Sequence, residues 1–328
     1  MTLKDLIVPM RDDYGTEPGH VNFSRSSGQA DKKLGLITDS GANSILLRSH
    51  ICSFKDHFSR LALSDLGCYE NRLTPNDAND LVIEARQSGI IPVMVGVFPD
   101  FYQNGYTQSD NMVCISSSVP DANFGHGIGF IGYQRHLVPH QVVQEIESFN
   151  YGCMSLGKLR SHPSIVEPVM RNTEVLYVNM NAVRKADAPG ISGCLPSGLN
   201  SEEFCQLMKY AGASSQLKAV FIDLNEGSTL SESETTLIAE GIWYMMEGLN
   251  MFYNDHPSLS GDFSSFIVHH PQYDDDIEFI RNEKTSRWWI IKTGDDTNRT
   301  YLACANEEYH QSVNGEMPDR LLKFLAHE

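Results

Sequence analysis

The chain has 328 residues, of which 41% are hydrophobic, and a formal charge of −17 from 25 basic and 42 acidic residues. This length is enough for a large α/β domain with a sizeable core. The negative charge repels phosphate backbones and anionic lipid surfaces, and no local cluster of Lys and Arg offsets it. We therefore expect no nucleic-acid partner. Because no run of about 18 apolar residues exists, we also expect no membrane insertion.

The seven cysteines are scattered without a Cys-x-x-Cys pair, and their odd number does not suggest a disulfide framework. The opening segment, Met1 to Leu6, has too short an apolar run for a signal peptide. We therefore expect a cytoplasmic location. The acidic run Asp274 to Asp276, followed by Glu278, is expected to be a solvated loop, because it lacks the alternating oxygen ligands and the glycine of a calcium loop.

Predicted strands and helices alternate along most of the chain. Roughly the first thirty residues are polar and rich in Gly and Ser, and are expected to be an irregular lead-in. A capping signal at Thr74–Asp77, with proline at the first helical position, predicts a helix that buries Ala78, Leu81, Val82 and Ala85. Further strands are predicted at 90–95, 112–115, 128–133, 175–180 and 219–224, and helices at 140–149, 163–171, 200–211 and 231–253.

This alternation predicts a three-layer α/β/α sandwich with a mainly parallel, doubly wound sheet. The last part of the chain differs, because strand-like segments follow one another there without long helices between them: 264–269, 287–291 and 301–303. We predict a single domain over 1–328, with a β-rich C-terminal extension at 256–328 packed on it and a terminal helix at 318–326. The neighbouring Trp288 and Trp289 are a candidate aromatic contact surface, although strand alternation directs one of them into the core.

Ligands of a doubly wound sheet bind at the carboxyl ends of its strands, so the segments that follow the predicted strands are candidate sites. The strand that starts at Val175 leads into Asn179-Met180-Asn181, then Ala188-Pro189-Gly190, then Gly198-Leu199 and an acidic helix start at Glu202-Glu203. This order resembles the arginase/ureohydrolase family, which includes agmatinases and formiminoglutamate hydrolases. There a Ser-Phe-Asp-x-Asp strand end precedes an Ala-Pro-Gly turn, a Gly-Leu pair and a helix with an acidic start. The resemblance spans roughly residues 35–255.

The resemblance implies a centre of two manganese ions that turns a bridging water into hydroxide for attack on a guanidinium-type carbon. The family holds these ions with a Gly-Gly-x-His loop, an Asp-x-His-x-Asp loop and the Asp-x-Asp pair. Carried over to this sequence, those six positions hold neutral residues: Pro99, Ser116, Ser118, Pro120, Asn179 and Asn181. A shift of one residue in the first two loops would restore only Asp100 or Asp121. We therefore expect a degenerate metal site and no manganese cofactor.

Asp223 and Asn225 are the candidate binding residues. The resemblance places Asp223 at the position of a substrate-contacting glutamate, and Asn225 at an asparagine two residues later. The pair would then be the remnant of a guanidinium or amino-acid pocket. The competing interpretation is a strand-end carboxylate that caps the next loop.

Other reactive side chains carry weaker signals. His126 and His136 flank a predicted strand and are candidate acid/base groups, but loop histidines without an identified partner are more often solvent-facing or structural. Cys114 and Cys153 lack a Cys-His-Asn context, so we expect buried structural cysteines.

The sequence favours a non-catalytic ureohydrolase-fold protein, a pseudoenzyme, over an enzyme. Such a protein would act as a homo-oligomer, through a protein partner, or through a small-molecule ligand, because a scaffold can persist after its site has decayed. The alternative is a divergent hydrolase of C–N bonds in amidine or guanidino substrates. That enzyme would use Asp100, Asp121, Asp223 and a histidine in a rearranged site.

Overall fold

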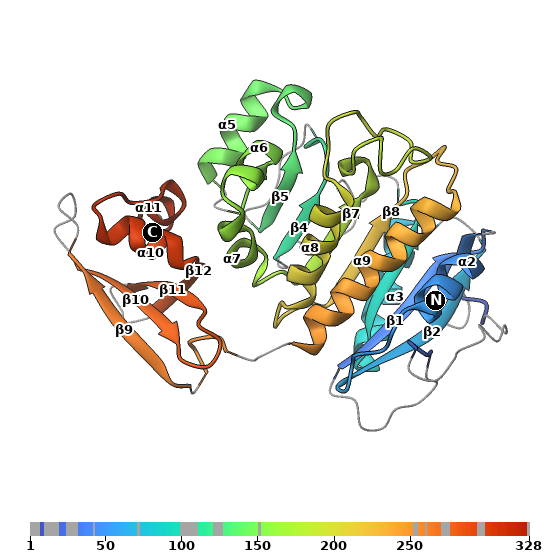
Figure 1. Ribbon diagram of the computed structural model, residues 1–328, viewed down its shortest axis with the longest axis horizontal. Coiled ribbons are helices and arrows are strands. Elements are labelled where there is room, and N and C mark those ends of the chain that lie inside the picture. Colours follow the sequence, from blue (N-terminus) through green and yellow to red (C-terminus); the bar gives the residue numbers. More distant parts are fainter. Residues whose placement is uncertain are drawn as a thin grey trace.

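A computed structural model describes residues 7–9, 20–23, 32–41, 43–70, 73–98, 111–120, 127–149, 152–251, 255–259, 261–269, 276–293 and 299–326 of the chain. A parallel eight-stranded sheet forms its centre, with helices on both faces, and a four-stranded antiparallel sheet lies beside it (Figure 1). The predicted three-layer class with a β-rich C-terminal extension is confirmed. None of the described helices has the length and apolar composition needed to cross a membrane.

The central sheet has the strand order β2-β1-β3-β8-β7-β4-β5-β6, and all neighbouring strands in it are parallel. The strands are β1 (Lys32–Asp39), β2 (Leu61–Tyr69), β3 (Ile91–Gly96), β4 (Met112–Ile115), β5 (Ile128–Tyr133), β6 (Met154–Ser155), β7 (Val175–Asn179) and β8 (Ala219–Asp223). The order reverses around β3, β8, β7 and β4, which is where a sheet of this class binds ligands. Strands β1, β2 and β6 were not predicted as strands, whereas the other five lie where the sequence placed them.

Each face of this sheet has its own core, because successive side chains of a strand point to opposite sides. One core joins residues such as Val95, Ile115 and Ile222 to the helices of one layer: α2 (Asn43–Ser53), α6 (Leu156–Ser161), α7 (Val166–Met170), α8 (Ser201–Gly212) and α9 (Glu232–Asn250). The other core joins residues such as Met94 and Tyr177 to α3 (Pro75–Gln87) and α5 (His140–Phe149).

Helix α3 begins as the sequence predicted. The Thr74 hydroxyl accepts a hydrogen bond from the Asp77 backbone N–H at 3.2 Å, and the Asp77 carboxylate accepts one from the Thr74 N–H at 3.0 Å. This reciprocal pair satisfies backbone donors that the first helical turn leaves without partners. The four predicted apolar positions of this helix are all buried.

The C-terminal extension is a separate sheet with helices on one side. It comprises β9 (Phe263–Val268), β10 (Ile277–Asn282), β11 (Trp288–Thr293), β12 (Arg299–Cys304), α10 (Asn306–Val313) and α11 (Asp319–Ala326). Its link to the rest of the chain includes Arg171, at the end of α7. The Arg171 guanidinium donates to the Trp288 carbonyl oxygen at 2.8 Å and lies 4.7 Å from the centre of the Trp289 ring.

Two expectations for this extension were wrong. Trp288 and Trp289 form no exposed aromatic surface, because they are 6% and 1% exposed on opposite faces of the small sheet. Glu278 does not belong to a solvated loop, because it lies in β10 and accepts a hydrogen bond from the Ser265 hydroxyl at 2.8 Å. Asp276 is exposed and precedes β10, as expected, whereas Asp274 and Asp275 lie outside the described residues.

Glycines allow α8 and α9 to pack closely over the sheet (Figure 1). A Cβ atom on Gly212 would lie 2.1 Å from the Met245 carbonyl oxygen, and one on Gly248 would lie 2.1 Å from the Lys209 carbonyl oxygen. Both contacts are with backbone, which cannot move aside as a flexible side chain would. Close packing of these helices therefore depends on the missing side chains.

We predict that Gly212→Ala lowers the free energy of unfolding by about 1–3 kcal/mol, because the added methyl group overpacks the helix interface. Urea denaturation measures this change. Gly157→Ala in α6 is the matched control, because a Cβ atom there meets nothing within 4 Å. Alanine is also the better helix former, so the control should match or exceed the wild-type stability by up to about 1 kcal/mol. Equal stabilities of the two variants would contradict this account of the interface.

Candidate functional site

The candidate site lies where the carboxyl ends of β3, β8, β7 and β4 meet. Asp223 is the last residue of β8, and it stands in register with Gly96 of β3 on one side and Asn179 of β7 on the other. The next strand, β4, pairs with β7 through Ile115 and Val178. The parallel order therefore brings together strand ends that are far apart in the sequence.

Asp223 is 5% exposed, and both of its carboxylate oxygens are hydrogen-bonded. Oδ1 accepts from the backbone N–H groups of Phe98, at 3.3 Å, and Asn225, at 2.9 Å. Oδ2 accepts from the hydroxyl of Tyr177. Burying a carboxylate is costly unless such donors surround it. The geometry of Asp223 thus matches the carboxylate that caps the loop after its strand.

Asn225 continues the same turn. Its backbone has φ of 60°, in the left-handed region that asparagine tolerates better than most residues. Its side-chain Nδ2 donates to the Ser192 carbonyl oxygen at 3.2 Å. The two predicted binding residues therefore lie together, and the hydrogen bonds of both side chains go to other parts of the chain.

The two asparagines after β7 and the serines after β4 form a second hydrogen-bonded group. The Asn179 side-chain oxygen accepts from the Asn181 backbone N–H at 2.9 Å, and the Asn181 side-chain oxygen accepts from the Ser117 N–H at 3.2 Å. After β4, the Ser116 hydroxyl accepts from the Ser118 N–H at 3.4 Å. The structure thus places Asn181 beside the loop that follows β4.

Pro120 closes this loop and is half-buried, whereas Pro99 lies outside the described residues. Asp100, Asp121 and His126, which belong to the alternative hypothesis or to the candidate acid/base groups, also lie outside them. Over the described ranges, no group of three or more His, Cys, Asp or Glu side chains is arranged to hold a metal ion.

The remaining reactive candidates lie apart from this centre or deep in the core. His136 is exposed in the short 3-10 helix at Arg135–Leu137. Cys114 and Cys153 are buried, as expected, and burial raises the pKa of the Cys153 thiol to about 12. A thiol with so high a pKa holds almost no reactive thiolate near neutral pH.

Sequence reasoning missed the side chains that complete the network. Tyr177 is buried, and burial together with the nearby Asp223 carboxylate raises the pKa of its hydroxyl. Gln134, directly after β5, forms a separate side-chain pair: it donates from Nε2 to the Ser197 carbonyl oxygen at 3.0 Å and accepts from the Ser197 hydroxyl. A polar group at an interior position of an apolar strand, as at Tyr177, was the available signal, since a buried hydroxyl needs a partner.

We predict that Asp223→Asn lowers the free energy of unfolding by about 1–3 kcal/mol, because the hydrogen bonds that a carboxylate accepts become weaker ones to a neutral amide, and Nδ2 can no longer accept from the Tyr177 hydroxyl. Urea denaturation, with circular dichroism as the readout, tests this. Glu145→Gln removes the same charge from an exposed position of α5 and should leave stability within about 0.5 kcal/mol. A stability change no larger than that of the control would rule out the capping role.

No protein-family model matches the chain, and no curated protein is similar to it in sequence. Similar solved structures exist. A formiminoglutamase from Trypanosoma cruzi, determined with Mn²⁺, superposes with a TM-score of 0.56 at 13% identity, covering 70% of this chain and 97% of the other. The formimidoylglutamase from Bacillus subtilis superposes with a TM-score of 0.53 at 13% identity, covering 77% of this chain and 92% of the other. A further T. cruzi structure, described as an arginase superfamily protein, gives 0.56 at 13% identity, with coverages of 70% and 96%. The chain therefore has the arginase/ureohydrolase fold.

Proposed function

We propose that this chain is a non-catalytic ureohydrolase-fold protein that acts by binding a protein partner or a small molecule. One observation carries the proposal. At the ends of β4 and β7, the side-chain oxygens at the implied metal-ligand positions are neutral, and Ser116, Asn179 and Asn181 already accept hydrogen bonds from backbone N–H groups.

The lack of negative charge explains why these hydroxyl and amide oxygens would bind two manganese ions weakly. Two divalent ions place four positive charges in one cavity, and carboxylates both bind and neutralise them. Hydroxyl and amide oxygens bring no negative charge. Each of these oxygens also uses one of its two lone pairs for a backbone N–H group, which leaves a single lone pair for any other partner. The residues present therefore do not fit a dimanganese centre.

A divergent C–N hydrolase is not favoured by the described residues. Of the three carboxylates in that hypothetical site, Asp223 lies within the described residues. Its two oxygens accept hydrogen bonds from the Phe98 and Asn225 backbone N–H groups and from the Tyr177 hydroxyl. A general base needs hydrogen-bonding reach to its substrate. This carboxylate is directed at the chain instead.

The proposal includes the assembly of the protein and its location in the cell. Assembly as a homo-oligomer or with a protein partner would give the scaffold a role without turnover. A cytoplasmic location fits the seven cysteines, which are buried and form no disulfide with one another, because a reducing compartment keeps cysteines as thiols.

The test combines metal analysis with an activity assay. We predict that protein equilibrated with MnCl₂ and then freed of unbound metal retains far less than one manganese per chain, as measured by plasma mass spectrometry. Hydrolysis of formiminoglutamate, arginine and agmatine should stay at the rate of the protein-free control with manganese present. Stoichiometric manganese, or hydrolysis of any of these substrates, would overturn the proposal.

A double variant gives this test a positive comparison. Asn179→Asp with Asn181→Asp restores the carboxylate pair that the resemblance implies. We predict that this variant retains more manganese than the wild type in the same analysis, because two negative charges then adjoin the site. Equal retention in both proteins would mean that these asparagines do not occupy the ligand positions.

A further inference from the structure

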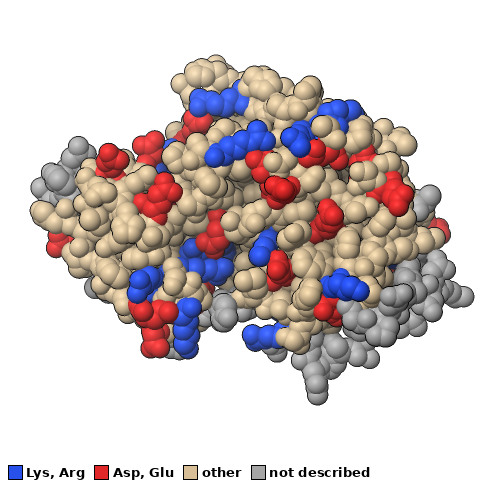
Figure 2. All heavy atoms as spheres, in the orientation of Figure 1, with Lys and Arg blue, Asp and Glu red and all other residues tan. Residues whose placement is uncertain are grey.

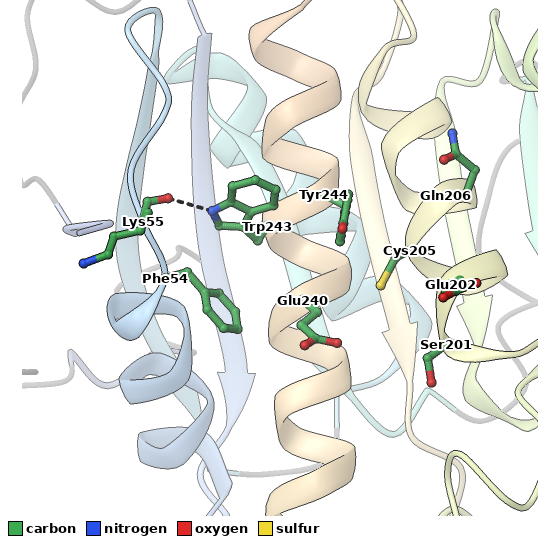
Figure 3. A pocket seen from close by; sticks show the side chains of 9 residues that line it. All are labelled: Phe54, Lys55, Ser201, Glu202, Cys205, Gln206, Glu240, Trp243 and Tyr244. Carbon is green, nitrogen blue, oxygen red and sulfur yellow. Dashed lines mark hydrogen bonds between the residues drawn. The ribbon is translucent and has the colours of Figure 1, made fainter. Parts of the chain in front are cut away.

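A second candidate site lies on the outer surface of the helical layer, on the α8–α9 side of the sheet rather than at the strand ends. A groove of about 550 Å³ is bounded by the exposed edges of α8 and α9 and by the end of α2. Its lining residues are Phe54, Lys55, Ser201, Glu202, Cys205, Gln206, Glu240, Trp243 and Tyr244 (Figure 3). This volume is in the range of small-molecule sites. The site does not depend on the fate of the metal centre.

The two helices α8 and α9 form most of the groove, and helical spacing explains which of their residues line it together. Glu240, Trp243 and Tyr244 stand three and four residues apart on α9, so they share one face of that helix. Glu202 and Cys205 share a face of α8 in the same way. The groove therefore combines two aromatic side chains and a carboxylate of α9 with a carboxylate of α8.

The aromatic part of the groove is held in place. The Trp243 ring donates from Nε1 to the Lys55 carbonyl oxygen at 2.9 Å (Figure 3). The centre of the ring lies 5.3 Å from that of Tyr244 and 5.4 Å from that of Phe58. A ring fixed by a hydrogen bond and edge contacts loses little freedom when a ligand binds. Such preorganisation favours binding.

The carboxylates of the groove are those of Glu202 and Glu240. Within the described part of the chain, Glu202 and Glu240 make no hydrogen bond or ion pair through their side chains. The helix dipole stabilises Glu202, which lies in the first turn of α8. Glu240 lies in the middle of α9, where the helix dipole does not stabilise its negative charge. The ammonium group of Lys55 points away from the groove (Figure 3) and lies 2.8 Å from the His20 ring nitrogen Nε2.

The local charge at this groove differs from that of the surrounding surface. On the face drawn in Figure 2, acidic and basic side chains are interspersed. At the groove, two carboxylates and the rings of Phe54, Trp243 and Tyr244 occur together, and Lys55, the basic side chain among the described lining residues, directs its ammonium group away. Aromatic faces and carboxylates are the two groups that attract organic cations.

We propose that the groove binds an alkylated ammonium group, with Trp243 and Tyr244 contacting its methyl groups and Glu240 opposing its charge. Rings attract a cation through the negative potential of their faces, and a methylated ammonium loses less hydration energy than a bare one when it enters a partly apolar groove. The group belongs either to a free metabolite or to a methylated lysine side chain of another protein.

Calorimetric titration of the full-length protein with choline tests the proposal. The neutral carbon isostere 3,3-dimethylbutan-1-ol has the same shape without the charge. We expect saturable choline binding, and binding of the isostere weaker by at least about tenfold. Choline binding should also weaken as salt rises, because the groove is open to solvent. Absence of saturable choline binding, or equal affinity for the isostere, would overturn the proposal.

Variants place the binding in this groove. Glu240→Gln should weaken choline binding by about fivefold to tenfold, and Tyr244→Leu should weaken it by a similar factor. Glu232→Gln is the matched control, because it removes one charge from the exposed first turn of the same helix, outside the groove. Thermal melts identify any variant that fails to fold. If Glu240→Gln and Glu232→Gln both bind choline like the wild type, the groove is not the site.

A third titration distinguishes the two sources of the group. Nα-acetyl-trimethyllysine amide presents the same cation on a protein-like backbone. Tighter binding of this compound than of choline supports a methylated side chain, and tighter binding of choline supports a free metabolite. Binding of neither compound overturns the proposal.

Discussion

The buried carboxylate of Asp223 joins the ends of three neighbouring strands. Its hydrogen bonds reach Phe98 after β3, Asn225 after its own strand β8, and Tyr177 within β7. These strands lie side by side at the point where the strand order of the sheet reverses. The geometry of this part of the candidate site depends on the carboxylate, because its hydrogen bonds hold the segments that leave the sheet after β3 and β8.

In the proposed function, side-chain oxygens of the chain take the place of metal ions at the strand ends, because buried backbone groups need hydrogen-bond partners. Strand ends at the reversal point leave backbone N–H groups that need acceptors. Here Asn179, Asn181 and Ser116 supply neutral oxygens to those groups. A cluster of carboxylates in the same place would repel itself unless cations were present. In the proposed function, the absence of metal ions and the absence of carboxylates therefore go together, because neutral oxygens need no cations to offset their charge.

Much of the fold was predictable from local sequence signals. Apolar runs identified β3, β4, β5, β7 and β8, and the Thr74 capping signal located the start of α3. Strands β1 and β2 were missed because polar residues interrupt their pattern. In β2, Asp65 forms a pair with Arg48 of α2, at 2.8 and 2.9 Å, and Arg48 is fully buried. Such a partner 17 residues away gives no local signal.

The site was predictable only in part, for the same physical reason. Asp223 and Asn225 were identified from the resemblance, but their partners were not, because Tyr177 and Ser192 are distant in sequence. Trp288 and Trp289 show the converse error. A single predicted strand does not reveal that α10 and α11 cover one of its faces and that Arg171 covers the other.

The most direct test of the central claim is anomalous diffraction at the manganese edge from crystals soaked in MnCl₂. We expect no anomalous peak between the ends of β4 and β7, with Asn179 and Asn181 keeping their hydrogen bonds to backbone N–H groups. A pair of peaks bound to these asparagines or to Ser116 would contradict it.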